Sequence, residues 1–375
     1  MFAAEGALLE AHGHEVLRYT LHNESVTDMS RFEVAKSTVW NGAAYRDLRS
    51  LIRRERPHIA HFHNTFPLMS PAAYYAAKAE GVTVVQTLHN YRLLCSNALF
   101  FREGRVCEDC LGKAVPWPGV AHACYRGSRA SSGAVASMLT VHRLLNTWNK
   151  EVDKYIALTE FARDKFIQGG MPAEKILVKP NFLHSDPGVG EGNGGYMLFV
   201  GRLSPEKGIE VLLEAWSRLE RKSNLKIVGD GPLAPEVARA GDRLENVEWL
   251  GRQPRERVLD LMKNAQALLF PSTWYEGFPT VIVEAYAVGL PVIASDLGSM
   301  SSLIDHGRTG LHFSPGDPKD LARQVAWAST HQAERTRMRE EARAEYEDKY
   351  TSDINYRYLM GIYEAATGAS LLEHR

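Results

Sequence analysis

Short apolar runs alternate with longer helical stretches along the first half of the chain. Short apolar runs occupy 58–64, 82–90, 153–159 and 175–182, and the first two end in polar residues. Continuous apolar runs of this length are typical of strands buried on both faces of a parallel sheet. Residues 95–130 interrupt the alternation with a hairpin signal at 102–105, so we expect an insertion there.

The second half repeats the alternation after a glycine-rich segment, 184–195, that is typical of a linker. We expect strands at 196–201, 225–229, 247–251, 267–272, 290–296 and 310–314. We expect helices at 208–220, 235–242, 255–265 and 280–288, and further helices within 318–348. This pattern predicts an α/β fold with two doubly wound parallel-sheet domains, residues 1–183 and 196–348, facing a cleft. A last amphipathic helix at 351–366 is expected to cross back to the first domain.

The composition is that of a globular enzyme and gives no support for nucleic acid as a partner. The 375 residues are 45% hydrophobic and 24% charged, with a formal net charge of −1. No apolar run approaches the length of a membrane span, and the first residues include acids where a secretory signal would be basic, so we expect a cytoplasmic protein. The basic segment 46–57 predicts a solvated helix face, with peripheral contact at the inner face of the membrane as its alternative.

All four cysteines fall within residues 95–124, inside the expected insertion. In a reducing compartment this clustering argues against a disulfide framework and favours either a metal site or ordinary packing. The spacing C-x11-C-x2-C-x13-C admits one structural Zn²⁺ held by four thiolates, and it is equally compatible with ordinary buried thiols. The residues concerned are Cys95, Cys107, Cys110 and Cys124.

The segment EGFPTVIVE places Glu276 and Glu284 on either side of a Gly-Phe-Pro step. Pro279 suits the first position of a helix because its φ is fixed and it has no N–H. The helix would end at Gly289, with the first glutamate on the preceding loop and the second on its second turn. Because the free amides of the first turn attract an anion, the segment predicts a ligand that is part phosphate and part polyol. A capped helix with two solvated glutamates is the alternative.

Three other predicted strands of the second half are followed by residues suited to a nucleotide. Arg202 and Lys207 follow the first strand and offer cations to a phosphate. Asp230 begins a tight loop after the second strand, and Arg252, after the third, is placed to touch a base ring. Because ligands of doubly wound sheets sit beyond the carboxyl ends of the strands, these residues predict one binding site.

The segments GRLSPEKG, VGDGP, PSTWYEGFPTVIVEAYAVGLPVIAS and RTGLHF resemble the retaining, nucleotide-sugar-dependent glycosyltransferases of family 4, which have the GT-B fold. The resemblance extends over almost the whole chain. It implies transfer of a sugar from a nucleotide-diphosphate donor to a glycan or lipid-linked acceptor, with retention of configuration, in the synthesis of a cell-surface polysaccharide or glycolipid. It implies no cofactor for catalysis.

The resemblance also implies roles for individual residues. Arg202 and Lys207 would bind the donor diphosphate. Glu284 would bond the ribose hydroxyls, and Glu276 would face the transferred sugar as a catalytic residue. The remaining donor-binding positions are Gly201, Gly229, Asp230, Gly231, Arg252, Gly277, Phe278, Pro279, Thr280 and Val281.

His89, at the end of the predicted strand 82–90, matches the family histidine that lies beside the donor sugar and the acceptor. His63, Asn64 and Asn90 are weaker candidates for the acceptor side, because a lone polar residue at a strand end is usually structural. The resemblance implies front-face substitution without a carboxylate nucleophile. The physical requirement is stabilisation of the leaving diphosphate, which the two cations and the helix N-terminus can supply.

The first residues, MFAAEGALLEAHG, predict an amphipathic helix that ends at Gly13. A doubly wound domain normally opens with a strand and a glycine-rich turn, and family members that resemble this stretch have both upstream of it. We therefore expect that the first strand of the N-terminal domain is missing from this chain. Its absence would leave neighbouring strands unpaired or force them together. The alternative is that residues 1–57 complete the sheet in another way.

Two other functions fit a nucleotide-sugar site on this fold. A sugar-nucleotide epimerase would need no acceptor, and a non-catalytic binding protein would hold the donor without turnover. A nicotinamide-dependent oxidoreductase should carry G-x-G-x-x-G directly after a strand, and none of the predicted strands is followed by that pattern.

Overall fold

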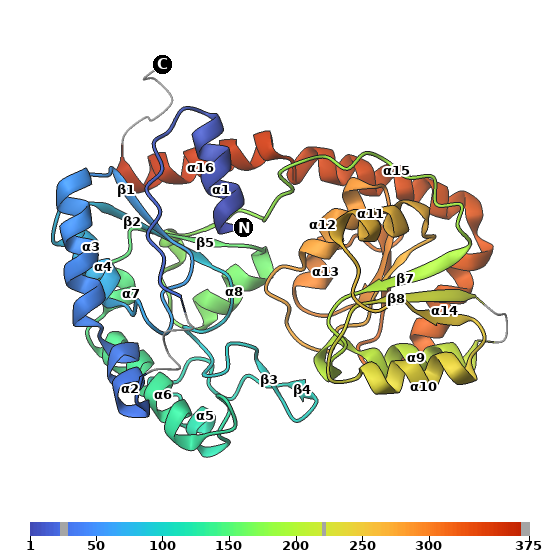
Figure 1. Cartoon of the computed structure of the whole chain (residues 1–375), viewed down its shortest axis with the longest axis horizontal. Coiled ribbons are helices and arrows are strands. Elements are labelled where there is room, and N and C mark those ends of the chain that lie inside the picture. Colours follow the sequence, from blue (N-terminus) through green and yellow to red (C-terminus); the bar gives the residue numbers. More distant parts are fainter. Residues whose placement is uncertain (23–28, 220–222, 369–375) are drawn as a thin grey trace. The chain divides into compact units, whose positions relative to one another are not determined.

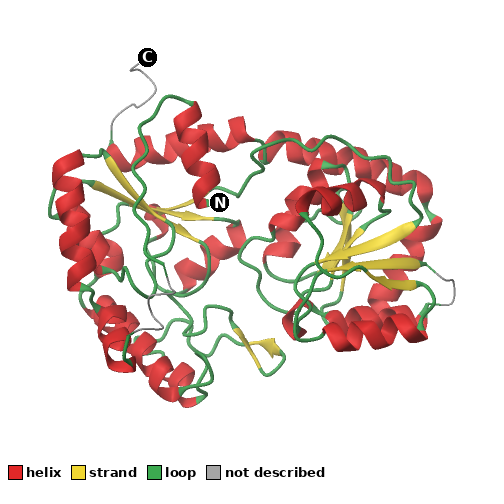
Figure 2. Ribbon diagram, viewed as in Figure 1, coloured by secondary structure: helices red, strands yellow, loops and turns green. Residues whose placement is uncertain are grey.

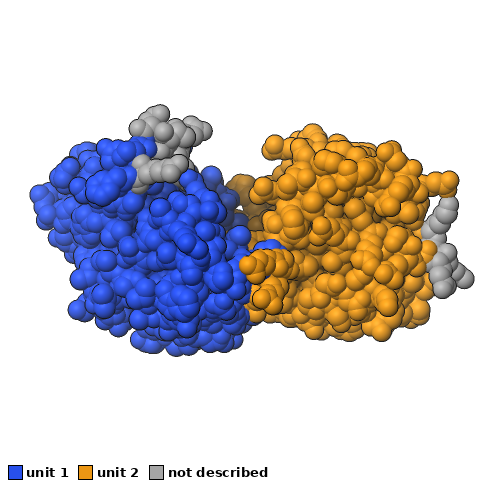
Figure 3. Space-filling model, turned by 90° about the horizontal axis from the view of Figure 1, so that it is seen from below, with its two compact units in different colours: residues 1–102, 107–180, 356–375 blue, residues 103–106, 181–355 orange. Residues whose placement is uncertain are grey.

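The computed structural model describes residues 1–22, 29–219 and 223–368. The chain divides into two compact units, which are coloured separately in Figure 3. Unit 1 contains residues 1–102, 107–180 and 356–375, and unit 2 contains residues 103–106 and 181–355. No helix in the described ranges is long and apolar enough to cross a membrane.

The sheet of unit 1 has four parallel strands, and each of them lies within a predicted apolar run (Figure 2). In sheet order they are β1 Ile59–Phe62, β2 Thr83–Leu88, β5 Lys154–Ala157 and β6 Ile176–Val178. Val85 and Ile156 lie on one face and pack against the C-terminal helix α16, Ser352–Thr367. Gln86 lies on the opposite face, where its side chain accepts a hydrogen bond from the Tyr74 hydroxyl. The four predicted strands are therefore confirmed, with both faces covered.

The helices of unit 1 lie before, between and after its strands along the chain. They are α1 Phe2–Ala11, α2 Arg31–Val39, α3 Gly42–Glu55, α4 Ala72–Lys78, α5 Trp117–Ala121, α6 Arg129–Leu144, α7 Thr147–Lys150, α8 Glu160–Gln168 and the short η2 Ala173–Lys175 (Figure 1). Helix α3 buries Leu48 and Ile52, and Arg49 and Arg53 on its outer side both pair with Glu80. These ion pairs support the solvated-face interpretation of the basic segment.

Strand β1 lies at one edge of the sheet of unit 1. Within the described part of the chain only β2 pairs with it, and residues 14–22 form neither helix nor strand. Helix α1 forms as predicted and is followed by Gly13, whose φ is +83°. The expected additional strand upstream of α1 stays a prediction.

The predicted hairpin of the insertion is present as β3 Phe101–Arg102 and β4 Arg105–Val106. The insertion is anchored by a few large side chains that pack on the domain. Phe100 is fully buried and packs against Tyr91, which in turn packs against Phe166 of α8. This part of the chain therefore contributes little apolar core of its own, as the sequence suggests.

The sheet of unit 2 contains six parallel strands in the order β12-β11-β10-β7-β8-β9. Their bounds are β7 Tyr196–Val200, β8 Asn224–Val228, β9 Val247–Trp249, β10 Leu268–Phe270, β11 Val292–Ser295 and β12 Gly310–Phe313. All six predicted strands are present. From β7 the sheet grows through β8 and β9 in one direction and through β10, β11 and β12 in the other, which is the doubly wound order.

Two apolar clusters cover the two faces of this sheet. The helices that supply them are α9 Ile209–Arg218, α10 Ala234–Arg243, α11 Arg255–Asn264, α12 Thr280–Ala287, α13 Ser299–Leu303, α14 Pro318–Thr330 and α15 Gln332–Lys349, with a short η3 at Pro205–Lys207. Residue 220, the expected end of α9, lies outside the described residues. One detail of the prediction is wrong by a residue: Pro279 has extended backbone angles and precedes α12 as its N-cap, so Thr280 is the first helical residue.

Candidate functional site

The strand order of unit 2 places two of the predicted loops side by side. Strands β7 and β10 are neighbours, yet the next strand after each lies on its far side. The loops that follow β7 and β10 therefore diverge, and this switch point is where doubly wound sheets bind their ligands. Lys207 follows β7 and Glu276 follows β10.

Lys207 and Glu276 form an ion pair at this switch point. The Nζ of Lys207 lies 2.7 Å from Oε1 of Glu276. The same oxygen accepts hydrogen bonds from Ser272 Oγ at 2.6 Å and from Trp274 Nε1 at 2.8 Å. Because Glu276 is only 5% exposed, these donors hold its carboxylate in one position. The two residues that the sequence assigned to different parts of a donor are thus brought into contact.

A side chain of α13 holds the loop between Glu276 and α12 through hydrogen bonds to its backbone. Ser299 is buried, and its hydroxyl donates to the carbonyl oxygens of Glu276 at 2.8 Å and Gly277 at 3.3 Å. Phe278 packs against the core with Tyr350. The first amides of α12 then follow at Thr280, which is exposed. A helix N-terminus in this place suits an anionic group.

Glu284 occupies the second turn of α12, as predicted, and has a partner that sequence reasoning missed. Arg255, the first residue of α11, places its guanidinium 3.3 Å from the Glu284 carboxylate. Burial raises the pKa of Glu284, and Arg255 partly opposes that rise. No local signal distinguishes Arg255 from its neighbour Arg257, because the contact depends on how α11 packs beside α12.

The glycines at the ends of β7 and β8 allow their loops to approach closely. A Cβ on Gly229, whose φ is +139°, would lie 1.8 Å from the carbonyl oxygen of Gly201. The Gly229 N–H donates to Gly251, and the Asp230 carbonyl accepts from Leu203, so three strand ends stay aligned. The absence of a side chain between these strand ends is therefore a structural requirement.

The remaining predicted donor residues lie on the same edge of the sheet. Asp230 accepts a hydrogen bond from the amide of the next residue, Gly231, at 2.7 Å, which closes the tight loop. Arg202 and Arg252 are exposed, and neither forms an ion pair with a residue in the described ranges. These two cations are available to a ligand, whereas Lys207 is already paired with Glu276.

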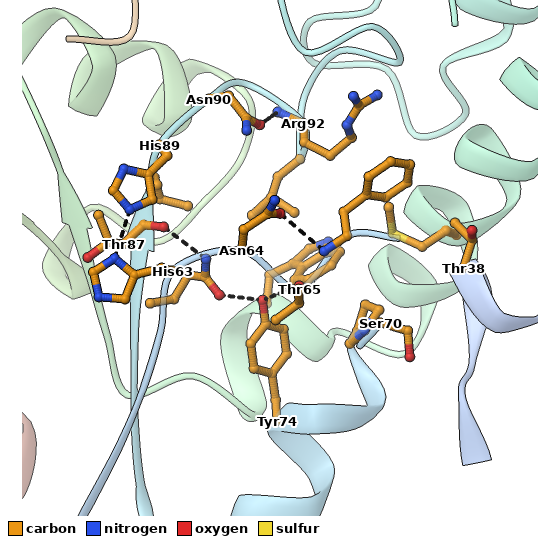
Figure 4. A pocket seen from close by; sticks show the side chains of 17 residues that line it. Thr38, His63, Asn64, Thr65, Ser70, Tyr74, Thr87, His89, Asn90 and Arg92 are labelled. Carbon is orange, nitrogen blue, oxygen red and sulfur yellow. Dashed lines mark hydrogen bonds between the residues drawn. The ribbon is translucent and has the colours of Figure 1, made fainter. Parts of the chain in front are cut away.

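Unit 1 has a cavity of about 460 Å³, including its mouth, at the ends of β1 and β2. Figure 4 shows His63 and His89 at one side of it and Tyr74 below. The Nδ1 of His63 lies 2.9 Å from Nε2 of His89, and the two rings stack with centroids 5.1 Å apart. Tyr74 bonds Gln86 at 2.6 Å inside the same cavity, a polar pair that sequence reasoning missed.

The two asparagines of the predicted acceptor side have local structural roles. Asn64 Oδ1 accepts from the amide of Phe66 at 3.1 Å, and Asn90 Oδ1 accepts from the amide of Arg92 at 3.0 Å (Figure 4). Both are turns of the type that asparagine side chains stabilise. Their side chains still line the cavity, so a second role toward a ligand stays a prediction.

A buried acid lies behind the two histidines. Glu5 of α1 is 2% exposed and its carboxylate pairs with Lys179, which follows β6 and is fully buried. Its other oxygen lies 3.1 Å from Nε2 of His63. The sequence carried a signal, because Glu5 shares a helix face with Leu8 and Leu9 and so projects toward the core.

The environment keeps these histidines neutral near pH 7. Burial lowers the pKa of His63 to about 3 and the pKa of His89 to about 4. Burial alone would raise the pKa of Glu5, but the charge of Lys179, with help from His61 and His63, lowers it to about 2. The cluster therefore consists of a carboxylate, an ammonium and neutral imidazoles.

Within the described residues, Glu5, His61 and His63 are the one group of three potential metal ligands whose atoms all lie within 4.8 Å of one another. The contacts favour a hydrogen-bond network over a cation. The ring nitrogens of His61 already contact Tyr363 OH at 2.9 Å and Thr87 Oγ1 at 2.8 Å. The ammonium of Lys179 lies against Glu5 and opposes a second cation there.

The four cysteines surround one small cavity in the insertion and form no disulfide. Burial, with the neighbouring thiols, raises the pKa of Cys110 to about 11, and burial raises the pKa of Cys124. Cys95 donates to Asn97 at 2.9 Å. Among the residues that the structure describes, no three of these sulfur atoms form a group within 4.8 Å of one another, although all four thiols border the same cavity.

Both units match models of known protein families. The family model described as "Glycosyl transferase 4-like domain" matches residues 3–181, and "Glycosyl transferases group 1" matches residues 187–345. The amylovoran biosynthesis glycosyltransferase AmsK of Erwinia amylovora is 30% identical over 225 residues, which are 56% of this chain and 55% of AmsK. The chain spans about half the length of the first curated relatives that it matches.

Solved structures share the fold. HepE of Anabaena in complex with UDP-glucose has a TM-score of 0.63 at 18% identity, over 97% of this chain and 88% of HepE. Sucrose-phosphate synthase of Thermosynechococcus elongatus has a TM-score of 0.69 at 16% identity, over 97% and 92% of the two chains. The two parallel-sheet units therefore define a GT-B protein. The two family models together span nearly the whole sequence, and the chain belongs to the group 1 glycosyltransferases, family 4.

Proposed function

We propose that this chain is a retaining glycosyltransferase that moves a sugar from a nucleotide-diphosphate donor to a glycan or lipid-linked acceptor, in the synthesis of a polysaccharide or glycolipid. The observation that carries the proposal is the contact between Lys207 and Glu276 at the switch point of unit 2, directly before α12. A cation, a fixed carboxylate and a helix N-terminus there match a diphosphate joined to a sugar.

The donor would be held by groups that follow β7 and β10 of unit 2. Arg202, Lys207 and the first amides of α12 would take the diphosphate, and Glu284 the ribose hydroxyls. Glu276, whose position is fixed by three donors to one oxygen, would bond the hydroxyls of the transferred sugar. In the transfer step negative charge develops on the leaving diphosphate, and fixed cations and amides stabilise that charge.

His89 of unit 1 is proposed to act in the transfer step. It lines the cavity of unit 1, and its ring is held by a hydrogen bond and by stacking on His63. A neutral imidazole can accept or donate a hydrogen bond with a sugar hydroxyl. The same cavity is the proposed acceptor side, with Asn64 and Asn90 on its wall.

The donor base is the first point to test. HepE has been solved with UDP and with UDP-glucose. We therefore propose a uridine-diphosphate sugar, and a thermal-shift screen of UDP-, GDP- and ADP-sugars tests it. Stabilisation by a GDP- or ADP-sugar in place of the UDP-sugar would refute the base assignment.

Release of nucleotide diphosphate distinguishes the proposed activity from its alternatives. A transferase releases the diphosphate in proportion to an added glycan or lipid-linked acceptor. An epimerase changes the sugar of the donor without acceptor, and a binding protein shifts in melting temperature without turnover. Either of the last two outcomes would refute the transferase.

We also propose that the four cysteines hold one structural zinc ion. All four thiols border the same small cavity, and the insertion that contains them has little apolar core. A closed set of four thiolates is a ligand set that zinc prefers, and binding would release the thiol protons. The sulfur atoms would have to approach one another to bind the ion.

Elemental analysis of the purified protein tests the zinc proposal. One zinc per chain, lost together with thermal stability in Cys107→Ser and Cys110→Ser, is the expected result. Absence of any bound metal from protein prepared without chelator, with all four thiols titrating as free, would refute it.

A further inference from the structure

A carboxylate and an ammonium are buried together beneath the cavity of unit 1. Glu5 is 2% exposed and Lys179 is fully buried, although 174 positions separate them in the chain. Breaking a buried pair of this kind is costly, because the remaining charge loses its partner. The pair therefore fixes which oxygen of Glu5 faces which neighbour.

The two oxygens of Glu5 have different neighbours. Oε1 accepts from Nζ of Lys179 at 2.5 Å, and Oε2 lies 3.1 Å from Nε2 of His63. The second approach is close in distance but not aligned as a standard hydrogen bond. Even so, a carboxylate oxygen at that distance repels a ring lone pair and attracts an N–H. It therefore favours the proton of His63 on Nε2.

The proton of His63 then decides the proton of His89. A neutral His63 that carries its proton on Nε2 has a lone pair on Nδ1, and Nδ1 is the atom that lies 2.9 Å from Nε2 of His89. A hydrogen bond there requires His89 to donate, so His89 carries its own proton on Nε2. Its Nδ1 is left with a lone pair and contacts no hydrogen-bonding partner among residues that the structure describes.

We propose that Glu5 is a positioning residue, which acts through His63 to hold His89 in the tautomer protonated on Nε2. His61 does not take part, because its ring nitrogens are bonded to Tyr363 and Thr87. The consequence for the reaction rests on the proposed function: His89 would present an acceptor, not a donor, at Nδ1. The tautomer itself does not depend on any assumed activity.

The substitution Glu5→Gln makes a specific test because it keeps the shape and reverses the polarity at one atom. Lys179 can only donate, so it holds the carbonyl oxygen of the glutamine and turns the amide NH₂ toward His63. The amide then donates to Nε2 of His63, which moves that proton to Nδ1. His63 in turn donates to Nε2 of His89, and His89 becomes protonated on Nδ1. The expected result is an inverted tautomer of His89.

Nitrogen-15 NMR of the full chain labelled in histidine reports the tautomer directly, with the His89 signals assigned by their absence in His89→Gln. The wild type should show His89 protonated on Nε2, and Glu5→Gln should show it protonated on Nδ1. The matched control is Glu10→Gln, which changes an exposed glutamate of the same helix that pairs with Arg18. It should leave the wild-type pattern unchanged.

A second variant keeps the proposal testable if Glu5→Gln does not fold. His63→Phe leaves the buried ion pair intact and preserves a ring that stacks on His89 and packs against Phe2. It removes the bond to Nε2 of His89, so both tautomers should appear. His89 protonated on Nε2 alone in either variant, or protonated on Nδ1 in the wild type, would overturn the proposal.

Two further measurements separate this proposal from the proposed function. Glu5→Gln should lower acceptor-dependent transfer by about tenfold or more, because a catalytic histidine in the wrong tautomer loses rate, and it should leave UDP affinity unchanged. Unchanged transfer with an inverted tautomer would overturn the role of that tautomer in the reaction. A wild-type chain that binds no donor and transfers no sugar would refute the proposed function, while the NMR result would still decide the tautomer.

Discussion

In the proposed donor complex the ammonium of Lys207 would turn from Glu276 toward a phosphate, and this exchange sets the size of the effect of removing the lysine. A hydrogen bond from an ammonium to a phosphate contributes about 1.5–3 kcal/mol. In the free protein Lys207 already bonds Glu276 at 2.7 Å, so binding exchanges one charged bond for another. We therefore expect Lys207→Ala to weaken UDP binding by about 1.5 kcal/mol, the lower end of that range, which corresponds to about tenfold in Kd.

The same exchange makes an opposite prediction for Glu276. Glu276→Gln keeps an oxygen for Ser272 and Trp274 but removes the negative charge that competes for Lys207. Its affinity for free UDP should equal or exceed that of the wild type, while sugar transfer falls. In the double variant the affinity should return to that of Lys207→Ala, because the residue that gains from the change is gone.

Isothermal titration with UDP measures these affinities without a requirement for an acceptor. Lys319→Ala, which removes an exposed lysine at the start of α14, is the matched control and should bind like the wild type. Wild-type affinity in Lys207→Ala would refute the phosphate role. Weaker UDP binding in Glu276→Gln would refute the exchange and assign the nucleotide to the glutamate.

Three other predictions follow from contacts within the individual units. Glu284→Ala should weaken the binding of UDP and of the whole donor alike, by about 1–2 kcal/mol in titrations, because the Glu284 carboxylate would bond the ribose in both. Weaker binding of the sugar-bearing donor alone would reverse the roles of the two glutamates. Gly229→Ala should lower the free energy of unfolding in urea by more than about 3 kcal/mol, because the new Cβ would lie 1.8 Å from a carbonyl oxygen. The control Gly133→Ala lies in open space on α6 and should raise the free energy of unfolding slightly. Similar effects of the two substitutions would refute the close-approach argument. His61, His63 and His89 of unit 1 have pKa values of about 3 to 4, below the ordinary value of 6.5, so the unfolded chain takes up more protons than the folded chain as the pH falls. The free energy of unfolding in urea should therefore fall as the pH drops from 6 to 4, by about 1 kcal/mol per histidine per pH unit, and a flat profile would contradict the neutral state of these rings.

Much of the fold was predictable because its signals are local. Most strands of the two sheets lie in an apolar run bounded by turn residues, and such a run needs only its own sequence to be recognised. The doubly wound class follows from the alternation, and the class alone places Lys207, Asp230, Arg252 and Glu276 after the carboxyl ends of strands. The position of Pro279 was missed by one residue, because proline is compatible with both the N-cap and the first turn.

What the sequence by itself determined was therefore the elements, their class and the edge at which the chemistry gathers. The tertiary structure decided which groups touch: Lys207 with Glu276, Arg255 with Glu284, and Glu5 with both Lys179 and His63. The physical reason is the separation along the chain between the residues that interact. Periodicity is fixed by neighbours a few positions apart, whereas a hydrogen bond between residues 174 positions apart depends on how helices and strands pack, and no local pattern encodes that geometry.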